Sequence, residues 1–202
     1  LWNPKNAGDA LLFGSLYFDD IYLEEGAVTP PPDDAAGIYS ESYTDVTIPY
    51  TQIINSADWS GNGASPDEES QAVTPVDGSY VLAVDFTDIG ASWGGVSFDF
   101  ASQSIAAYAT LVLSINTSAM PDLTYLGVKF EDNSGGNFEV NISAYTPEIS
   151  GDWAEYQIPL SVFSGVNLND VKYLGLWNPK NAGDALLFGS LYFDNIYLKS
   201  NN

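Results

Sequence analysis

The sequence contains no cysteine, no histidine and no arginine, and each absence excludes a class of protein. Without cysteine no disulfide can form. Without histidine the usual general base, the commonest zinc ligand and every Ser-His-Asp triad are missing, which excludes most hydrolase mechanisms. Five lysines face 27 acidic residues, so the net charge is −22. This charge excludes nucleic acid and anionic membrane surfaces as partners, and favours a neutral ligand or a cation.

Long apolar runs are also absent, and none approaches the roughly 20 residues that a membrane-spanning helix needs. Instead, one segment occurs twice. Residues 1–23 and residues 176–198 differ only at Asp20 versus Asn195. The offset of 175 residues is too long for a solenoid repeat, so it predicts a self-contained domain repeated in tandem.

Residues 1–23 are therefore interpreted as the C-terminal strands of the preceding repeat, and any signal peptide would lie upstream. Such an apolar segment cannot stand alone in water as strands. We expect it to exchange with the equivalent segment of another molecule, which would give a homo-oligomer or an open chain.

Residues 24–37 are acidic and rich in proline, which predicts an extended linker, and residues 38–200 form the repeated domain. Short alternating strands follow one another there, as in VLAVDF and GVSFDF, and no segment keeps a helical period. The pattern predicts an all-β fold, a two-sheet antiparallel jelly-roll β-sandwich. Residues 55–78 lack strand character and are expected to form a surface loop that carries Trp59.

Three sequence motifs near the end of the chain resemble those of a known family. They are GDWAEYQIPLSVF, VKYLGLWNP and SLYFDNIYL. They are similar to the second half of the galactose-binding-like jelly-roll carbohydrate-binding modules attached to bacterial glycoside hydrolases, some of them next to marine β-glucanases and agarases. The resemblance covers about residues 37–198 and implies a binding module. It also implies that Trp153 packs in the core, and that a structural calcium ion is held by Asp194 and Glu41.

An enzyme is disfavoured, although a two-carboxylate glycosidase remains conceivable without histidine. Glu131 and Asp132 are neighbours in a strand and point to opposite faces. Glu139 could approach Glu131 across a hairpin, but a solvated hairpin edge is the simpler interpretation. We therefore expect a non-catalytic domain.

A sugar site requires flat aromatic faces together with groups that bind hydroxyls. Trp59, Trp93 and Trp177 lie in polar or glycine-rich settings that would leave their rings accessible, although packing in the fold is an equal alternative for Trp93 and Trp177. The residues expected to complete the site are Asn178, Lys180, Lys129, Asn137, Asn141 and Tyr145.

The first hypothesis is a carbohydrate-binding module of a secreted, extracellular multi-module protein, with a neutral polysaccharide as its partner. A β-glucan such as laminarin, or an agar-type galactan, is the expected ligand. The alternative is a structural module of an extracellular stalk, surface layer or filament, in which tandem sandwiches bind one another.

Overall fold

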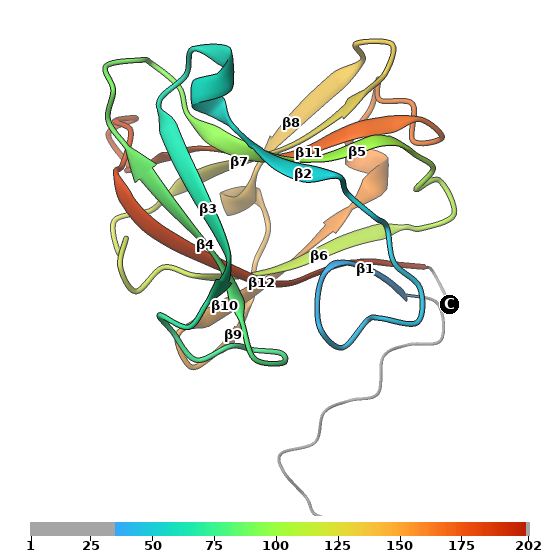
Figure 1. The fold of residues 1–202 in the computed structure, drawn as a ribbon, viewed down its shortest axis with the longest axis horizontal. Coiled ribbons are helices and arrows are strands. Elements are labelled where there is room, and N and C mark those ends of the chain that lie inside the picture. Colours follow the sequence, from blue (N-terminus) through green and yellow to red (C-terminus); the bar gives the residue numbers. More distant parts are fainter. Residues whose placement is uncertain (1–34, 201–202) are drawn as a thin grey trace, which may run out of the picture. The chain divides into compact units, whose positions relative to one another are not determined.

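The computed structural model describes residues 35–200, which fold into two antiparallel β-sheets that face each other (Figure 1). The strands are β1 (Ala35–Tyr39), β2 (Gln52–Asn55), β3 (Gly63–Ser70), β4 (Val81–Thr87), β5 (Gly95–Gln103), β6 (Thr110–Asn116), β7 (Tyr125–Asp132), β8 (Asn137–Asn141), β9 (Glu148–Ser150), β10 (Trp153–Pro159), β11 (Val171–Lys180) and β12 (Gly189–Lys199). Three 3₁₀ helices connect them: η1 (Ser56–Trp59), η2 (Ile142–Ala144) and η3 (Leu160–Val162). The fold is the predicted jelly-roll β-sandwich.

The seven-stranded sheet has the order β3-β4-β12-β6-β10-β9, and β1 pairs with the far end of β12. The five-stranded sheet has the order β2-β5-β11-β7-β8. Strand β12 lies between β4 and β6, at the centre of its sheet. The second copy of the duplicated segment, residues 176–198, therefore supplies the end of β11 and most of a central strand. The first copy, residues 1–23, lies outside the described residues.

The core fills the space between the sheets and follows the alternation of the sequence. In β4, Val84 and Phe86 are buried while Asp85 between them is exposed. In β5, Phe98 and Phe100 point inward in the same way. Because side chains alternate between the two faces of a strand, the residues between these apolar positions form the outer faces of the sandwich.

The predicted surface loop over residues 55–78 is wrong for much of its length. It contains η1 and the eight-residue strand β3. The sequence of β3, GASPDEES, has no apolar alternation, because β3 is an edge strand that is held by backbone pairing with β4. Pro66 fits an edge strand, since proline has no backbone N–H to donate to a neighbouring strand.

The predicted linker over residues 24–37 also ends too late. Strand β1 begins at Ala35, and Ala35 and Ala36 pair with Lys199 and Leu198 of β12. Small side chains do not mark a strand by hydrophobicity, yet these two alanines are buried. The rest of the predicted linker lies outside the described residues.

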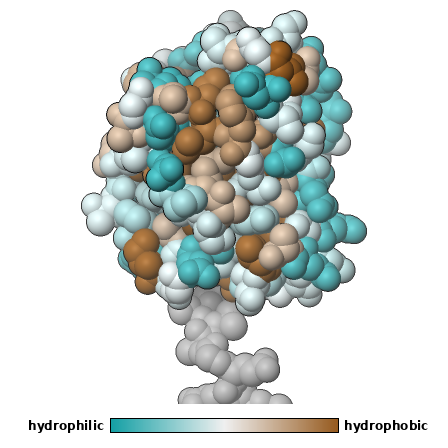
Figure 2. Space-filling model, turned by 90° about the vertical axis from the view of Figure 1, so that its left-hand side faces the viewer, coloured by the Kyte–Doolittle hydropathy of each residue, from teal (hydrophilic) through white to brown (hydrophobic). Residues whose placement is uncertain are grey.

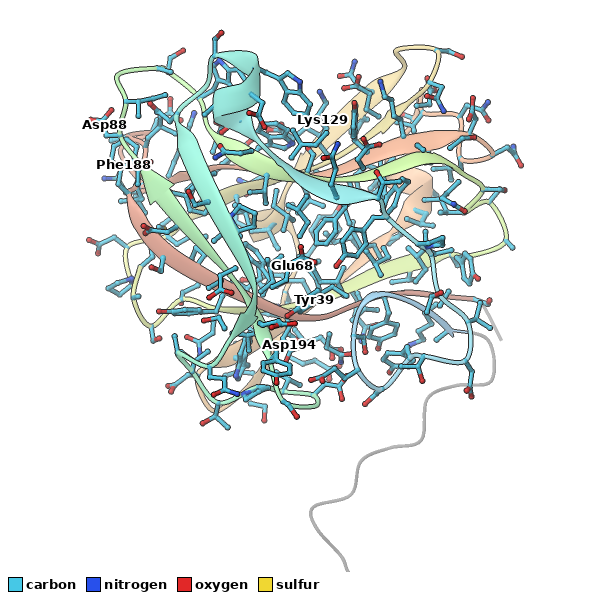
Figure 3. The ribbon with its side chains drawn as sticks, viewed as in Figure 1. Tyr39, Glu68, Asp88, Lys129, Phe188 and Asp194 are labelled. Atoms are coloured by element: carbon cyan, nitrogen blue, oxygen red, sulfur yellow. The ribbon has the colours of Figure 1, made fainter. Side chains whose placement is uncertain are left out.

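Among residues 35–200, no helix is long and apolar enough to cross a membrane. One side of the molecule displays apolar surface among hydrophilic side chains (Figure 2). Phe188, 43% exposed, lies at that side, which is the left-hand edge of Figure 3.

Candidate functional site

The outer face of the five-stranded sheet carries a cleft with a volume of about 680 Å³. Lys129, on β7, marks this face in Figure 3. The cleft is lined by Trp59, Trp93, Ser97, Lys129, Glu131, Glu139, Lys172, Tyr173, Gly175, Trp177 and Asn178. Strand β11 forms its floor, because Tyr173, Gly175 and Trp177 alternate along that strand and face the same side.

Glycine residues allow the Trp177 indole to lie flat on the sheet. Trp177 pairs with Gly95 of β5 on one side and with Gly127 of β7 on the other. A Cβ atom at Gly175 would lie 1.7 Å from Trp177 Nε1, and a Cβ at Gly95 would lie 2.5 Å from Trp177 Cε3. The indole therefore occupies the space that these two missing side chains leave.

The three tryptophans form one aromatic cluster. The Trp59 ring stacks on Trp177 with 6.0 Å between centroids and 27° between planes. Trp93 approaches Trp177 at 5.6 Å and 46°, and Tyr173 meets Trp59 edge-on at 5.6 Å. Trp59 remains 39% exposed, whereas Trp177 is 9% exposed. Trp59 is thus the accessible ring, and Trp177 is the layer beneath it.

Hydrogen bonds between side chains and backbone amides fix the turn that carries Trp59. Asn55 Oδ1 caps η1 by accepting from Ala57 N at 2.9 Å, and it also accepts from Ala64 N at 2.9 Å. Ser56 Oγ accepts from Gly95 N at 2.8 Å, which ties η1 to the strand below. Because these contacts join η1 to both sheets, the Trp59 ring is held in a defined position.

The Trp93 ring is fixed by a similar close approach. Asn62 N donates to Trp93 O at 2.7 Å, and a Cβ at Gly61 would lie 2.8 Å from the Trp93 ring. Asn62 is 2% exposed, and its side-chain oxygen accepts from Ile89 N and Ala91 N. The two rings are therefore positioned by the same turn.

The polar rim of the cleft is balanced in charge. Lys129 Nζ lies 3.1 Å from Glu131 Oε2. Tyr125 donates to Glu139, and burial followed by this hydrogen bond raises the pKa of the phenol. Lys172 Nζ lies 4.7 Å above the Tyr173 ring centroid. The lining therefore carries two lysines and two glutamates, although the whole chain has a net charge of −22.

Of the residues that the sequence indicates for a sugar site, five line this cleft: Trp59, Trp93, Trp177, Lys129 and Asn178. The side chain of Asn178 is already engaged, because its Oδ1 accepts from Gly94 N at 2.9 Å. Asn178 has a φ of 52° and lies where the register of β11 with β7 shifts, between Trp177 and Lys180. Its role in the structure is to hold the Trp93 loop.

The other four residues lie outside the lining. Lys180 forms an ion pair with Asp184 at 2.8 Å. Asn141 caps η2 through Ser143 N at 3.0 Å, and Tyr145 packs against the core. Asn137, which is exposed on β8, pairs with Glu131 of β7.

The sequence analysis does not identify four of the lining residues, which are Tyr173, Gly175, Lys172 and Ser97. The signal was available for Tyr173 and Gly175, since they stand four and two positions before Trp177 in one strand. Glu131 and Glu139 were considered only as a catalytic pair. In the structure Glu139 stands opposite Lys129, and Glu131 opposite Asn137.

The two carboxylates that were expected to bind calcium both accept hydrogen bonds from backbone amides. Asp194, 1% exposed, accepts from Val76 N at 2.7 Å and from Asp77 N at 3.0 Å, and burial raises its pKa to about 6. Glu41 Oε2 accepts from Ser79 N and from Tyr80 N. Within residues 35–200, no three acidic side chains gather closely enough to hold a metal ion. Because a carboxylate offers about four acceptor positions and calcium also takes carbonyl ligands, the calcium ion that the resemblance implies stays a prediction.

Comparison with known proteins supports the fold. No family model and no curated protein matches the sequence. Among solved structures, the chain is similar to a family 30 carbohydrate-binding module, with 17% identity, coverage of 69% of this chain and 74% of the other, and a TM-score of 0.51. It is also similar to the family 11 carbohydrate-binding module of the cellulosomal cellulase Lic26A-Cel5E of Clostridium thermocellum, with 16% identity, coverage of 74% and 86%, and a TM-score of 0.47. An exo-β-agarase matches at 14% identity over 75% of this chain and 23% of the enzyme, with a TM-score of 0.49.

Proposed function

We propose that this chain is a non-catalytic carbohydrate-binding module, and that the aromatic cleft on its five-stranded sheet is the ligand site. The ligand is a neutral polysaccharide, a β-glucan such as laminarin or an agar-type galactan. The module would direct a secreted multi-module protein to that polysaccharide.

The accessible Trp59 ring over the buried Trp177 ring is the observation that carries this proposal. A sugar ring presents an apolar face of C–H groups, which packs well against a flat, rigid aromatic surface. A cleft of about 680 Å³ is within the usual size range of small-ligand sites. In addition, Trp177 Nε1 is a buried donor with no hydrogen-bond partner among the described residues.

The charge of the lining favours a neutral ligand. Lys129 and Lys172 offset Glu131 and Glu139, and carboxylates and ammonium groups both form strong hydrogen bonds to hydroxyls. An anionic polysaccharide would meet the negative field of the whole protein. A neutral glycan avoids this repulsion and uses both kinds of group.

The carboxylates of the cleft are both engaged by neighbouring side chains. Glu131 is paired with Lys129, and Glu139 accepts from Tyr125. A glycosidase needs two carboxyl groups that flank the scissile bond, one as general acid and the other as base or nucleophile. Contacts that already occupy both groups favour a binding role over hydrolysis.

Retention of the full chain on insoluble or gel-embedded polysaccharides tests the proposal, with laminarin, agarose, mixed-linkage glucan and mannan as the panel. We expect retention on a neutral polysaccharide, and its loss in Trp59→Ala. Phe188→Ala is the matched control, because Phe188 is a similarly exposed aromatic residue outside the cleft. Equal retention of the Trp59 and Phe188 variants would contradict the site.

The alternative function is that of an extracellular structural module assembled by strand exchange. It rests on the duplicated segment, since residues 1–23 match residues of β11 and β12 at all but one position. On this alternative, the full chain should self-associate in analytical ultracentrifugation, and a chain lacking residues 1–23 should be a monomer. If the two have the same oligomeric state, strand exchange is wrong.

A further inference from the structure

The charged side chains that line the aromatic cleft divide into one ion pair and two single charges. Lys129 Nζ lies 3.1 Å from Glu131 Oε2, so these two groups neutralise each other. Lys172 and Glu139 also line the cleft, and within residues 35–200 neither forms an ion pair. Lys172 and Glu139 are therefore the charged groups of the cleft that have no ionic partner to compete with a ligand.

A β-bulge turns Lys172 toward the cleft. Val171 of β11 pairs with Asp132 of β7, and Tyr173, two positions later, pairs with Glu131, one position earlier in β7. Strand β11 thus carries one extra residue, and such bulges re-aim side chains. In a regular strand, Lys172 and Tyr173 would point to opposite faces, yet both line the cleft while Val171 is buried in the core. The bulge therefore adds an ammonium group beside an aromatic ring of the cleft.

The Lys172 ammonium group presents only hydrogen-bond donors to the cleft. Its Nζ lies 4.7 Å from the centroid of the Tyr173 ring. This distance is typical of a cation–π contact, which attracts the ammonium group to the ring face. An ammonium group has three N–H donors and no acceptor, so the ring contact leaves donors available for a ligand.

Glu139, on the edge strand β8, presents the opposite kind of group. Its carboxylate lies over β7, because a Cβ atom at Gly127 would lie 2.5 Å from Glu139 Oε1. Tyr125 donates to the same oxygen and holds it in place. A carboxylate has about four acceptor positions, so Glu139 can accept further hydrogen bonds. Gly127 pairs with Trp177, which puts this acceptor next to the aromatic cluster.

We propose that Lys172 and Glu139 are the specificity-determining residues of the aromatic cleft, an inference that rests on the proposed function. Lys172 donates to one hydroxyl oxygen of the bound glycan, and Glu139 accepts from another hydroxyl group. Strand β7 lies between the strands that carry them, so the ligand makes these contacts on opposite sides of β7. The cleft then selects a neutral glycan whose hydroxyl groups are free at these positions. A glycan that is O-methylated there has no hydrogen to donate to Glu139, and a site built to bind a hydroxyl rejects such an analogue.

Calorimetric titration of the full chain tests this proposal, with a hexasaccharide of laminarin and a hexasaccharide of agarose as the probes. Lys172→Met and Glu139→Gln keep the side-chain length and remove the charge. We expect each to weaken binding of the hexasaccharide that the wild type binds by about tenfold or more, since hydrogen bonds to charged groups are the stronger ones. The controls are Lys199→Met and Glu148→Gln, which remove the same charges outside the cleft. Equal weakening by the controls would overturn the proposal.

A modified ligand separates specificity from a structural role. The wild type should bind the O-methylated form of the hexasaccharide about tenfold or more weakly than the free form. In Lys172→Met/Glu139→Gln this ratio should shrink toward one, because the groups that require a free hydroxyl are gone. A loss of structure would lower the affinity for both forms and leave the ratio unchanged. An unchanged ratio in the double variant would therefore show that these two residues do not set the specificity.

The same titrations distinguish this inference from the proposed function. If Trp59→Ala loses binding while Lys172→Met and Glu139→Gln bind like the wild type, the cleft is the ligand site and the inference is wrong. If the wild type binds neither hexasaccharide and is retained on no polysaccharide of the panel, the proposed function and the inference are both wrong.

Discussion

The indole of Trp59 stacks on the indole of Trp177, with ring centroids 6.0 Å apart, although the two residues lie far apart in the sequence. Trp59 belongs to a 3₁₀ helix and Trp177 to the central strand of the five-stranded sheet. In this stacked arrangement the two tryptophans have different structural roles. Trp59 presents a face to solvent, and Trp177 supports it from below.

Replacement of each tryptophan by alanine should separate these tasks. Trp59→Ala should cost about 1 kcal/mol of folding free energy, the worth of an exposed aromatic pair, and should remove polysaccharide binding. Trp177→Ala should cost about 3–5 kcal/mol, because it leaves a cavity beneath the cluster. Urea denaturation measures both values. Equal destabilisation by the two changes would show that the layered arrangement is incorrect.

Gly175→Ala should disturb the same cluster from below. A Cβ atom there would lie 1.7 Å from Trp177 Nε1, so the indole must move. We expect a cost of about 1–3 kcal/mol, as for other overpacked sites, together with weaker polysaccharide binding. Gly183→Ala is the control, since the nearest atom to its Cβ is a side-chain oxygen at 3.3 Å. Full binding by Gly175→Ala would mean that the position of Trp177 is unimportant for the site.

The sequence predicted the sandwich because burial between two sheets imposes a period of two, as Val84, Asp85 and Phe86 show. It did not predict β3, because an edge strand is specified by its partner β4 and needs no apolar face of its own. The boundary at Ala35 was missed for a similar reason, since two alanines carry little hydrophobic signal.

The site was only partly visible in the sequence. The polar residues that follow Trp177, which are Asn178 and Lys180, indicated an accessible ring, but Trp59 and Trp93 cover it in the fold. Contacts between distant parts of the chain decide such exposure. Tyr173, by contrast, could have been found by counting alternate residues along the strand.

Removal of divalent cations tests the calcium ion that the family resemblance implies. An ion that binds only the folded state raises the thermal midpoint, so chelator should lower the midpoint and added calcium should restore it. Asp194 and Glu41 also accept backbone amides of the loop between β3 and β4. Asp194→Ala should therefore lower the midpoint even in chelator, because a buried donor without a partner costs about 1–3 kcal/mol. The exposed Asp85→Ala serves as control. A midpoint that chelator leaves unchanged would contradict the metal site.

The stability of the fold should depend on Asp132 in acid. Its carboxylate accepts from Asn167 N at 2.7 Å, from Gly136 N at 2.9 Å and from Ser134 N at 2.8 Å, and these bonds lower its pKa. A lowered pKa in the folded state adds stability above the unfolded pKa, and this stability is lost as the pH falls through the folded value.

Denaturation of wild type and Asp132→Asn at several pH values measures this contribution. The variant should be less stable near pH 7, and the difference should shrink as the pH falls below about 4, the ordinary pKa of aspartate. Asp85→Asn, in which the exposed carboxylate lacks such amide donors, should show no such trend. A difference that stays constant across the acidic range would contradict the role of Asp132.

The most direct test of the aromatic cleft is a titration of the ¹⁵N-labelled chain with a neutral β-glucan or agar oligosaccharide, followed through the indole N–H resonances. We predict that the resonances of Trp59, Trp93 and Trp177 shift together, while that of Trp153, on the other sheet, stays in place. A shift of the Trp153 resonance alone, or unchanged indole resonances with a polysaccharide that the chain retains, would contradict the assignment of the ligand site to this cleft.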